Sequence, residues 1–181
     1  MCGIIGYIGE KNPVEVLING LKSLEYRGYD SAGIALKEKD EIEVIKSVGK
    51  IVNLEDKIKS KELIPSHLGI AHTRWATHGK PSEKNAHPHT VGNVTLVHNG
   101  IIENAEELRE KLKKEGVTFN SETDTEVITA LINKYYENDP VEAINKALDE
   151  VKGSYALGIL FQGSDAVSYT HLRAHETRHD L

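Results

Sequence analysis

Apolar and polar positions alternate along this chain in two different periods, which predict a mixture of strands and helices. β-Branched or alternating runs predict strands, which lie at 3–9, 32–37, 41–46, 68–73, 94–98 and 154–162. Apolar residues at 3.6 spacing predict a helix after Asn12-Pro13, a short helix over 51–59, and three more helices between 104 and 153. Because helices and strands do not alternate strictly, we expect an α+β fold with mostly antiparallel strands.

Polar residues mark the predicted helix starts in the second half of the chain. Asn104 with Glu107, and Thr123 with Glu126, have the spacing of a capping box. In that motif the first side chain caps the helix and the acid three residues later binds back to the cap. The pair at 139–140, Asp followed by Pro, predicts the start of the last helix.

The pattern changes after Asp165. Residues 166–181 have no apolar period, and they hold three of the nine histidines of the chain. Such a segment seldom belongs to a packed core. We therefore expect one domain over 2–165, truncated at its C-terminal end, followed by a disordered or artefactual tail over 166–181.

Composition and charge narrow the classes of function. The chain has 181 residues, 39% of them hydrophobic, with 28 acidic and 22 basic side chains and a net charge of −6. Nucleic acids and anionic membranes bind clustered Lys and Arg, so this balance disfavours both. The longest apolar run, 156–161, is far shorter than the ~20 residues of a membrane span, and no signal-peptide pattern is present. We expect a soluble, cytoplasmic protein.

The single cysteine, Cys2, excludes an intrachain disulfide and a CxxC metal site. It is either a small residue near the N-terminus or a nucleophile that is exposed when Met1 is removed. In the second case the freed α-amine could act as the base for the thiol. Reference pKa values of about 7.7–8.0 for an α-amine and about 8.5 for a thiol make the two groups nearly matched. Gly3 would let a substrate approach closely.

Three further segments carry candidate binding groups. Arg74 and Trp75 are either a surface ion pair and core filler or parts of a site in which Arg74 binds a carboxylate. Asn99-Gly100 offers the amide and main-chain donors of an oxyanion hole, although Asn-Gly is also a strong signal for a hairpin turn. Asp124 complements the dipole of a predicted helix start, and it could also hold a substrate ammonium.

Four histidines, His72, His78, His87 and His89, lie within a short span. A His-x-His pair can bind zinc or copper. No cysteine pair accompanies them, however, and their spacing matches no HExxH or facial-triad pattern. We expect no metal site, and a metal hydrolase remains only as an alternative whose activity chelation would remove.

Several motifs, taken together, resemble one family. They are MCGIIG at 1–6, LEYRGYDSAG at 24–33, AHTRWATHG at 71–79, NAHPH at 85–89, HNGIIEN at 98–104 and SETDTEV at 121–127. In this order they resemble the N-terminal glutaminase domain of class II glutamine amidotransferases, and within that class the glutamine–fructose-6-phosphate aminotransferases. The resemblance covers about residues 1–165.

The resemblance implies an N-terminal-nucleophile hydrolase fold, which is a four-layer αββα sandwich with mostly antiparallel sheets, here incomplete at the C-terminus. It also implies that Cys2 attacks the side-chain amide of glutamine after Met1 is lost, while Asn99 and Gly100 hold the oxyanion. Arg74 would bind the α-carboxylate of glutamine and Asp124 its α-ammonium. The remaining implied pocket residues are Trp75, Thr77 and His78.

The resemblance implies partners as well as a reaction. In the family, ammonia passes to a C-terminal isomerase region that converts fructose 6-phosphate to glucosamine 6-phosphate, and we expect homo-oligomers only at full length. We therefore expect a glutaminase half without cofactor. The alternatives are an inactive truncated fragment, or the glutaminase domain of another class II amidotransferase such as an amidophosphoribosyltransferase.

Overall fold

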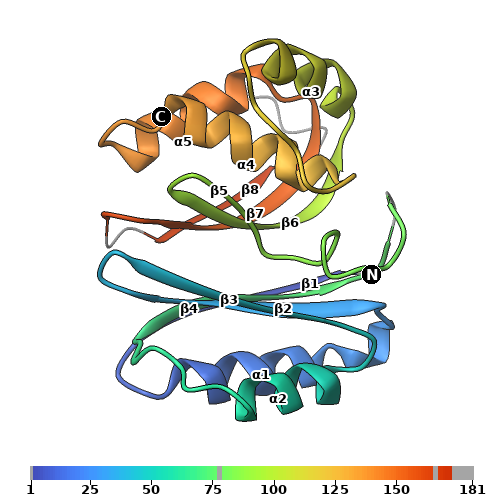
Figure 1. Cartoon of the computed structure of the whole chain (residues 1–181), viewed down its shortest axis with the longest axis vertical. Coiled ribbons are helices and arrows are strands. Elements are labelled where there is room, and N and C mark those ends of the chain that lie inside the picture. The colour runs from blue at the N-terminus through green and yellow to red at the C-terminus, as the bar shows by residue number, and fades with distance from the viewer. Residues whose placement is uncertain (1, 77–78, 165–166, 173–181) are drawn as a thin grey trace.

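Two four-stranded antiparallel sheets lie face to face between two layers of helices (Figure 1). This arrangement comes from a computed structural model, which describes residues 2–76 and 79–164 and the backbone of 167–172. The layers follow the chain order, because residues 3–74 build one sheet with its helices and residues 89–172 build the other.

The first sheet has the strand order β1-β4-β2-β3, with every neighbouring pair antiparallel. Two helices cover its outer face, as Figure 1 shows in blue and teal. The elements of this half are β1 (Gly3–Ile8), α1 (Pro13–Ser23), the 3₁₀ helix η1 (Glu25–Arg27), β2 (Ser31–Glu38), β3 (Glu41–Val48), α2 (Ile51–Lys59) and β4 (Leu68–Arg74).

The second sheet has the strand order β5-β6-β7-β8, and it is also antiparallel throughout. Three helices lie on the face that points away from the first sheet (Figure 1). The elements of this half are β5 (His89–Val91), β6 (Val94–Ile102), α3 (Ala105–Lys114), α4 (Asp124–Tyr135), α5 (Pro140–Glu150), β7 (Gly153–Phe161) and β8 (Val167–Leu172).

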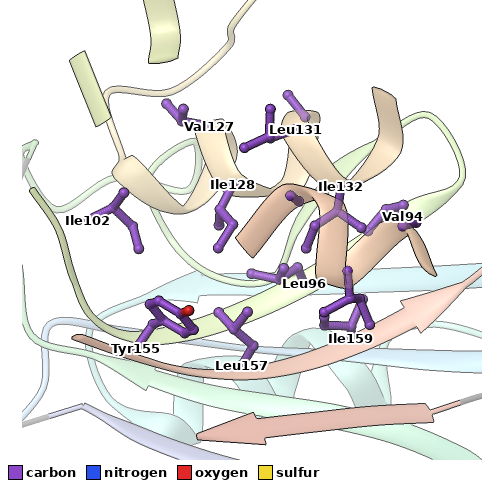
Figure 2. Close-up of a cluster of buried hydrophobic side chains, with 14 of the residues drawn as sticks. Val94, Leu96, Ile102, Val127, Ile128, Leu131, Ile132, Tyr155, Leu157 and Ile159 are labelled. Atoms are coloured by element: carbon purple, nitrogen blue, oxygen red, sulfur yellow. The ribbon is translucent and has the colours of Figure 1, made fainter. Parts of the chain in front are cut away.

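Apolar side chains form a separate layer at each of the three interfaces. Ile70 and Val97 belong to the thin layer between the two sheets. Figure 2 shows the layer between α4 and the second sheet, where Ile128 and Ile132 point toward Leu96 on β6. Each sheet is therefore covered on both faces, which explains why β2 and β4 are buried along almost their whole length.

The structure confirms the predicted α+β class with antiparallel strands, and the helix predicted over 51–59 is α2. Thr123 is the N-cap of α4, because its hydroxyl accepts the main-chain N–H of Glu126 at 3.3 Å. The second half of that capping box is not formed, because the Glu126 carboxylate accepts the N–H groups of Asn120 and Ser121 instead. The capping box predicted at Asn104 is wrong. That side chain instead binds the carbonyl oxygen of Glu150 and the N–H of Lys152, at 2.8 and 2.9 Å, so it ties α3 to the end of α5.

Residues 167–172, which the sequence places in a disordered tail, form β8 in this structure. They pair with β7 through main-chain hydrogen bonds, with Leu160 opposite Val167 and Tyr155 opposite Leu172. Pairing along a sheet edge needs only an extended backbone, so it does not require an apolar side-chain period. The domain boundary at 165 remains a prediction. Among the helices described, none is long and apolar enough to cross a membrane.

The layer between α4 and the second sheet should carry much of the stability. Ile132 is fully buried there, so Ile132→Ala should lower the free energy of unfolding by about 2–5 kcal/mol through lost burial and a cavity. Val141 on α5 is 61% exposed, so Val141→Ala is the control and should change that energy by less than about 0.5 kcal/mol. Urea unfolding followed by circular dichroism measures both, and equal losses would contradict this layered core.

Candidate active site

Strand ends from both sheets meet at a cavity of about 560 Å³. Cys2 lies immediately before β1, and Arg74 and Trp75 lie at the end of β4. Since β1 and β4 run antiparallel with Gly3 opposite Thr73, the register brings Cys2 beside Trp75 across 73 positions of sequence. Asn99 from β6 and Asp124 from α4 complete the lining from the other sheet layer.

The thiol of Cys2 is held at the cavity by the main chain of Trp75. The Trp75 N–H donates to Cys2 Sγ at 3.2 Å, and Sγ lies 3.6 Å from the Trp75 carbonyl oxygen. Gly3 permits this approach, because a side chain there would overlap Leu24 and crowd the Thr73 hydroxyl. Cys2 is only partly buried and is not in a disulfide, so its sulfur is accessible to a molecule in the cavity.

Asp30 organises the segment that carries Arg74, a role that the sequence reasoning missed. Its carboxylate accepts the Ala76 N–H and lies 3.9 Å from Arg74 Nη1, and its own N–H donates to the Arg74 carbonyl oxygen at 2.7 Å. Arg74 is 4% exposed, and the nearby Asp30 carboxylate offsets part of the cost of burying its charge. The position of Asp30 within the 24–33 motif was the available signal.

Asn99 and Gly100 lie inside β6 rather than in a turn. They are opposite Ala156 and Tyr155 of β7, so the hairpin-turn alternative is wrong: the chain stays extended to Ile102. The Asn99 side-chain Nδ2 donates to the Cys2 carbonyl oxygen at 3.3 Å. An amide donor therefore stands next to the cysteine, as an oxyanion hole requires.

Asp124 is the first residue of α4 and lies on the cavity wall. Its Oδ2 accepts the Ile102 N–H at 3.0 Å, and its Oδ1 lies 3.8 Å from His98 Nδ1. Asp124 is thus both a helix-start residue and a cavity residue. With Arg74 on the same cavity, the lining offers charges of both signs, which suits a ligand that carries a carboxylate and an ammonium.

The buried histidines bind protein atoms around the cavity. In the residues that the structure describes, no group of three or more His, Cys, Asp or Glu side chains could hold a metal ion. Burial lowers the pKa of His72 to about 3, and burial with neighbouring positive groups also lowers the pKa of His87 and His89. These rings are therefore neutral near pH 7. Thr77 and His78 lie outside the described residues.

Comparison with known proteins agrees with this geometry. A family model described as "Glutamine amidotransferase domain" matches residues 72–173, which is more than half of the chain. The chain belongs to this glutamine amidotransferase domain family. As the sandwich and its antiparallel sheets indicate, the domain shares the fold of class II amidotransferases.

Two curated relatives of this amidotransferase domain carry the same name. The glutamine–fructose-6-phosphate aminotransferase [isomerizing] of Clostridium tetani is 54% identical over 162 residues, and that of Acinetobacter baylyi is 53% identical. Each match covers 88% of this chain but 26% of the relative. The chain therefore spans about a quarter of the length of these relatives.

A solved structure shares the fold. The glutamine phosphoribosylpyrophosphate amidotransferase of B. subtilis, complexed with ADP and GMP, superposes with a TM-score of 0.76 at 28% identity. The match covers 88% of this amidotransferase domain and 35% of the solved chain. The higher identity to the aminotransferases places this domain nearer to them than to that enzyme.

Gly100 is the point at which β6 tolerates no side chain. Its φ is +133°, and a Cβ would overlap the carbonyl oxygen of Ser154. Gly100→Ala should therefore lower the free energy of unfolding by more than about 2 kcal/mol, through backbone strain plus the clash. Gly116, with φ +93° and open space around a Cβ, is the matched control. Gly116→Ala should cost only the strain, about 1–2 kcal/mol. Equal losses in urea unfolding would contradict the close contact at Gly100.

Proposed function

We propose that this domain hydrolyses the side-chain amide of L-glutamine at Cys2. The observation that carries the proposal is the composition of one cavity, which holds a thiol, an amide donor beside it, and charges of both signs. Glutamine is a zwitterion with a terminal amide, so its three functional groups match those three features. The family membership of the chain supports the same substrate.

The charges on the cavity wall would bind the two charged groups of glutamine. Arg74 offers a planar fork of donors to the α-carboxylate, and Asp124 accepts the α-ammonium. Trp75, whose side chain is 54% exposed, forms a wall beside the thiol. Thr77 and His78 complete the pocket in the resemblance to the family, and their participation rests on that resemblance alone.

The chemistry has two halves. Removal of Met1 leaves Cys2 with a free α-amine, which takes the thiol proton as sulfur attacks the glutamine side-chain carbonyl carbon. The new C–S bond pushes an electron pair onto oxygen, where Asn99 Nδ2 and the Gly100 N–H stabilise it. Collapse breaks the C–N bond, and ammonia leaves with the proton from the α-amine. Water then attacks the thioester, breaks the C–S bond, and releases glutamate and the thiol.

The wider role extends to a longer protein. Because the named relatives are about four times longer, we propose that ammonia is transferred to fructose 6-phosphate by a following isomerase region, to give glucosamine 6-phosphate. We expect that longer protein to form homo-oligomers. A free thiol stays reduced most readily in a reducing compartment, which favours the cytoplasm as its location. The alternatives are an inactive fragment and an amidophosphoribosyltransferase domain, and the second has less sequence identity in its favour.

Removing the thiol should abolish the reaction. Cys2→Ala should lower glutaminase activity at least about 10⁴-fold, since the nucleophile is lost. A glutamine-like electrophile should label Cys2 alone, and the mass of the mature chain should show that Met1 is absent. Ammonia release by Cys2→Ala, or labelling elsewhere, would contradict the mechanism. A wild-type protein that unfolds cooperatively but neither turns over nor is stabilised by glutamine would favour the inactive fragment.

Removing the charge of Asp124 should weaken glutamine binding more than it slows the chemical step. Asp124→Asn should raise KM for glutamine about 10–100-fold with a smaller change in kcat, because a charge-assisted contact of about 1.5–3 kcal/mol is lost. Asp139→Asn is the matched control, because Asp139 caps α5 and does not line the cavity. It should leave KM unchanged. A KM effect of equal size in both variants would rule out the assigned contact.

A further inference from the structure

A buried chain of hydrogen bonds connects the two sides of the cavity. It begins at Asn99, whose Oδ1 lies 2.8 Å from His72 Nε2, and continues with 3.0 Å between His72 Nδ1 and His87 Nδ1. His87 Nε2 lies 2.7 Å from Thr125 Oγ1, which is 3.0 Å from His98 Nδ1. The chain thus crosses from β4 and β6 of the two sheets to the start of α4.

The first link has one consistent proton arrangement. His72 Nε2 lies 3.0 Å from the main-chain carbonyl oxygen of His98, which can only accept, so Nε2 carries the proton. The amide atom of Asn99 that faces the same nitrogen must then be its oxygen. At the other end, Asn99 Nδ2 faces the main-chain carbonyl oxygen of Cys2, which also only accepts. Two carbonyl groups therefore determine the orientation of the Asn99 amide.

The remaining links follow in turn. His72 is neutral, so its Nδ1 accepts, and His87 Nδ1 must donate to it. His87 is also neutral, which makes its Nε2 the acceptor of the Thr125 hydroxyl proton. That hydroxyl has one proton, so His98 Nδ1–H must donate to Thr125 Oγ1. The Thr125 hydroxyl also lies 3.5 Å from Asp124 Oδ1, but His87 Nε2 at 2.7 Å is much the nearer acceptor. Each proton along the chain therefore has one assigned place.

We propose that His72 and His87 are positioning residues, which hold the Asn99 amide with its Nδ2 toward Cys2 through this ordered chain. The catalytic consequence rests on the proposed glutaminase function, whereas the proton order does not. An Asn amide is nearly symmetric in shape, so packing alone discriminates poorly between its two orientations. The reversed amide would present oxygen to the developing oxyanion and would repel it.

Labelled histidine tests the proton order in the wild-type domain without any activity assay. Long-range ¹⁵N–¹H correlation spectra distinguish the two neutral tautomers of each ring. We expect His72 as the Nε2–H tautomer and His87 and His98 as Nδ1–H tautomers near pH 7. His67, which is exposed, is the internal control and should show averaged signals. A charged His72, or a His72 protonated at Nδ1, would overturn the proposal.

Paired substitutions test the catalytic consequence. The side-chain nitrogen of Gln can replace His Nε2 as a donor, whereas Leu cannot. His72→Leu should lower kcat about 10²–10³-fold with KM within about threefold, the loss expected when an oxyanion donor is misplaced. The kcat of His72→Gln should be at least about tenfold higher than that of His72→Leu. Rescue by Gln supports a donor role, and equal defects in the two variants would contradict it.

A double-mutant cycle shows whether His72 acts through Asn99. In an Asn99→Ala background, His72→Leu should change kcat by less than about threefold, because the group that it positions is already gone. Additive losses would overturn the proposal. A wild-type domain that shows the expected tautomers but no glutaminase activity would instead contradict the proposed function and leave the ordered chain in place.

Discussion

Close stacking of the two sheets is the constraint on which the site depends. Ile70 and Val97 belong to the layer between them, and a Cβ built on Gly158 of β7 would lie 3.7 Å from the Ile4 and Ile70 side chains of the first sheet. Gly33 on β2 lets the segment before β5 pack against the first sheet, because a side chain there would overlap the carbonyl oxygen of His87. If the sheets moved apart, His72 of the first sheet could no longer reach Asn99 of the second.

The same stacking makes the polar groups near the cavity costly unless each finds a partner. Burying an unpaired polar group costs about 1–3 kcal/mol on protein mutational data, so isolated histidines would destabilise this interface. Linking His72, His87 and His98 through Thr125 offsets that cost, because their Nδ1 atoms and the Thr125 hydroxyl are all engaged. The desolvation that keeps His72 and His87 neutral also makes the proton order definite. The same hydrogen bonds therefore give the buried histidines their partners and orient the Asn99 amide.

Local sequence patterns predicted the helices and strands well, but they predicted the contacts between distant segments less well. The 3.6 period identified α2, and the cap at Thr123 was correct because that contact is made within four residues of chain. Asn104 fits a cap equally well by spacing, yet it binds the end of α5, a contact with a distant segment that spacing cannot contain. Asn99-Gly100 resembles a turn for the same reason: pairing with β7 overrides the local preference.

The sequence by itself determined the residue types of the candidate site and their order, since Cys2, Arg74, Asn99 and Asp124 stand in the long motifs through which the chain resembles its family. Only the tertiary structure decided which of these groups meet. The antiparallel register of β1 and β4 places Cys2 at Trp75, and the stacked sheets bring the Asn99 amide to the Cys2 carbonyl. The tertiary structure also decided the roles of four further residues, namely Asp30, His72, His87 and Thr125. Hydrogen bonds between segments separated by tens of residues depend on register and layer spacing, and neither leaves a period in the sequence.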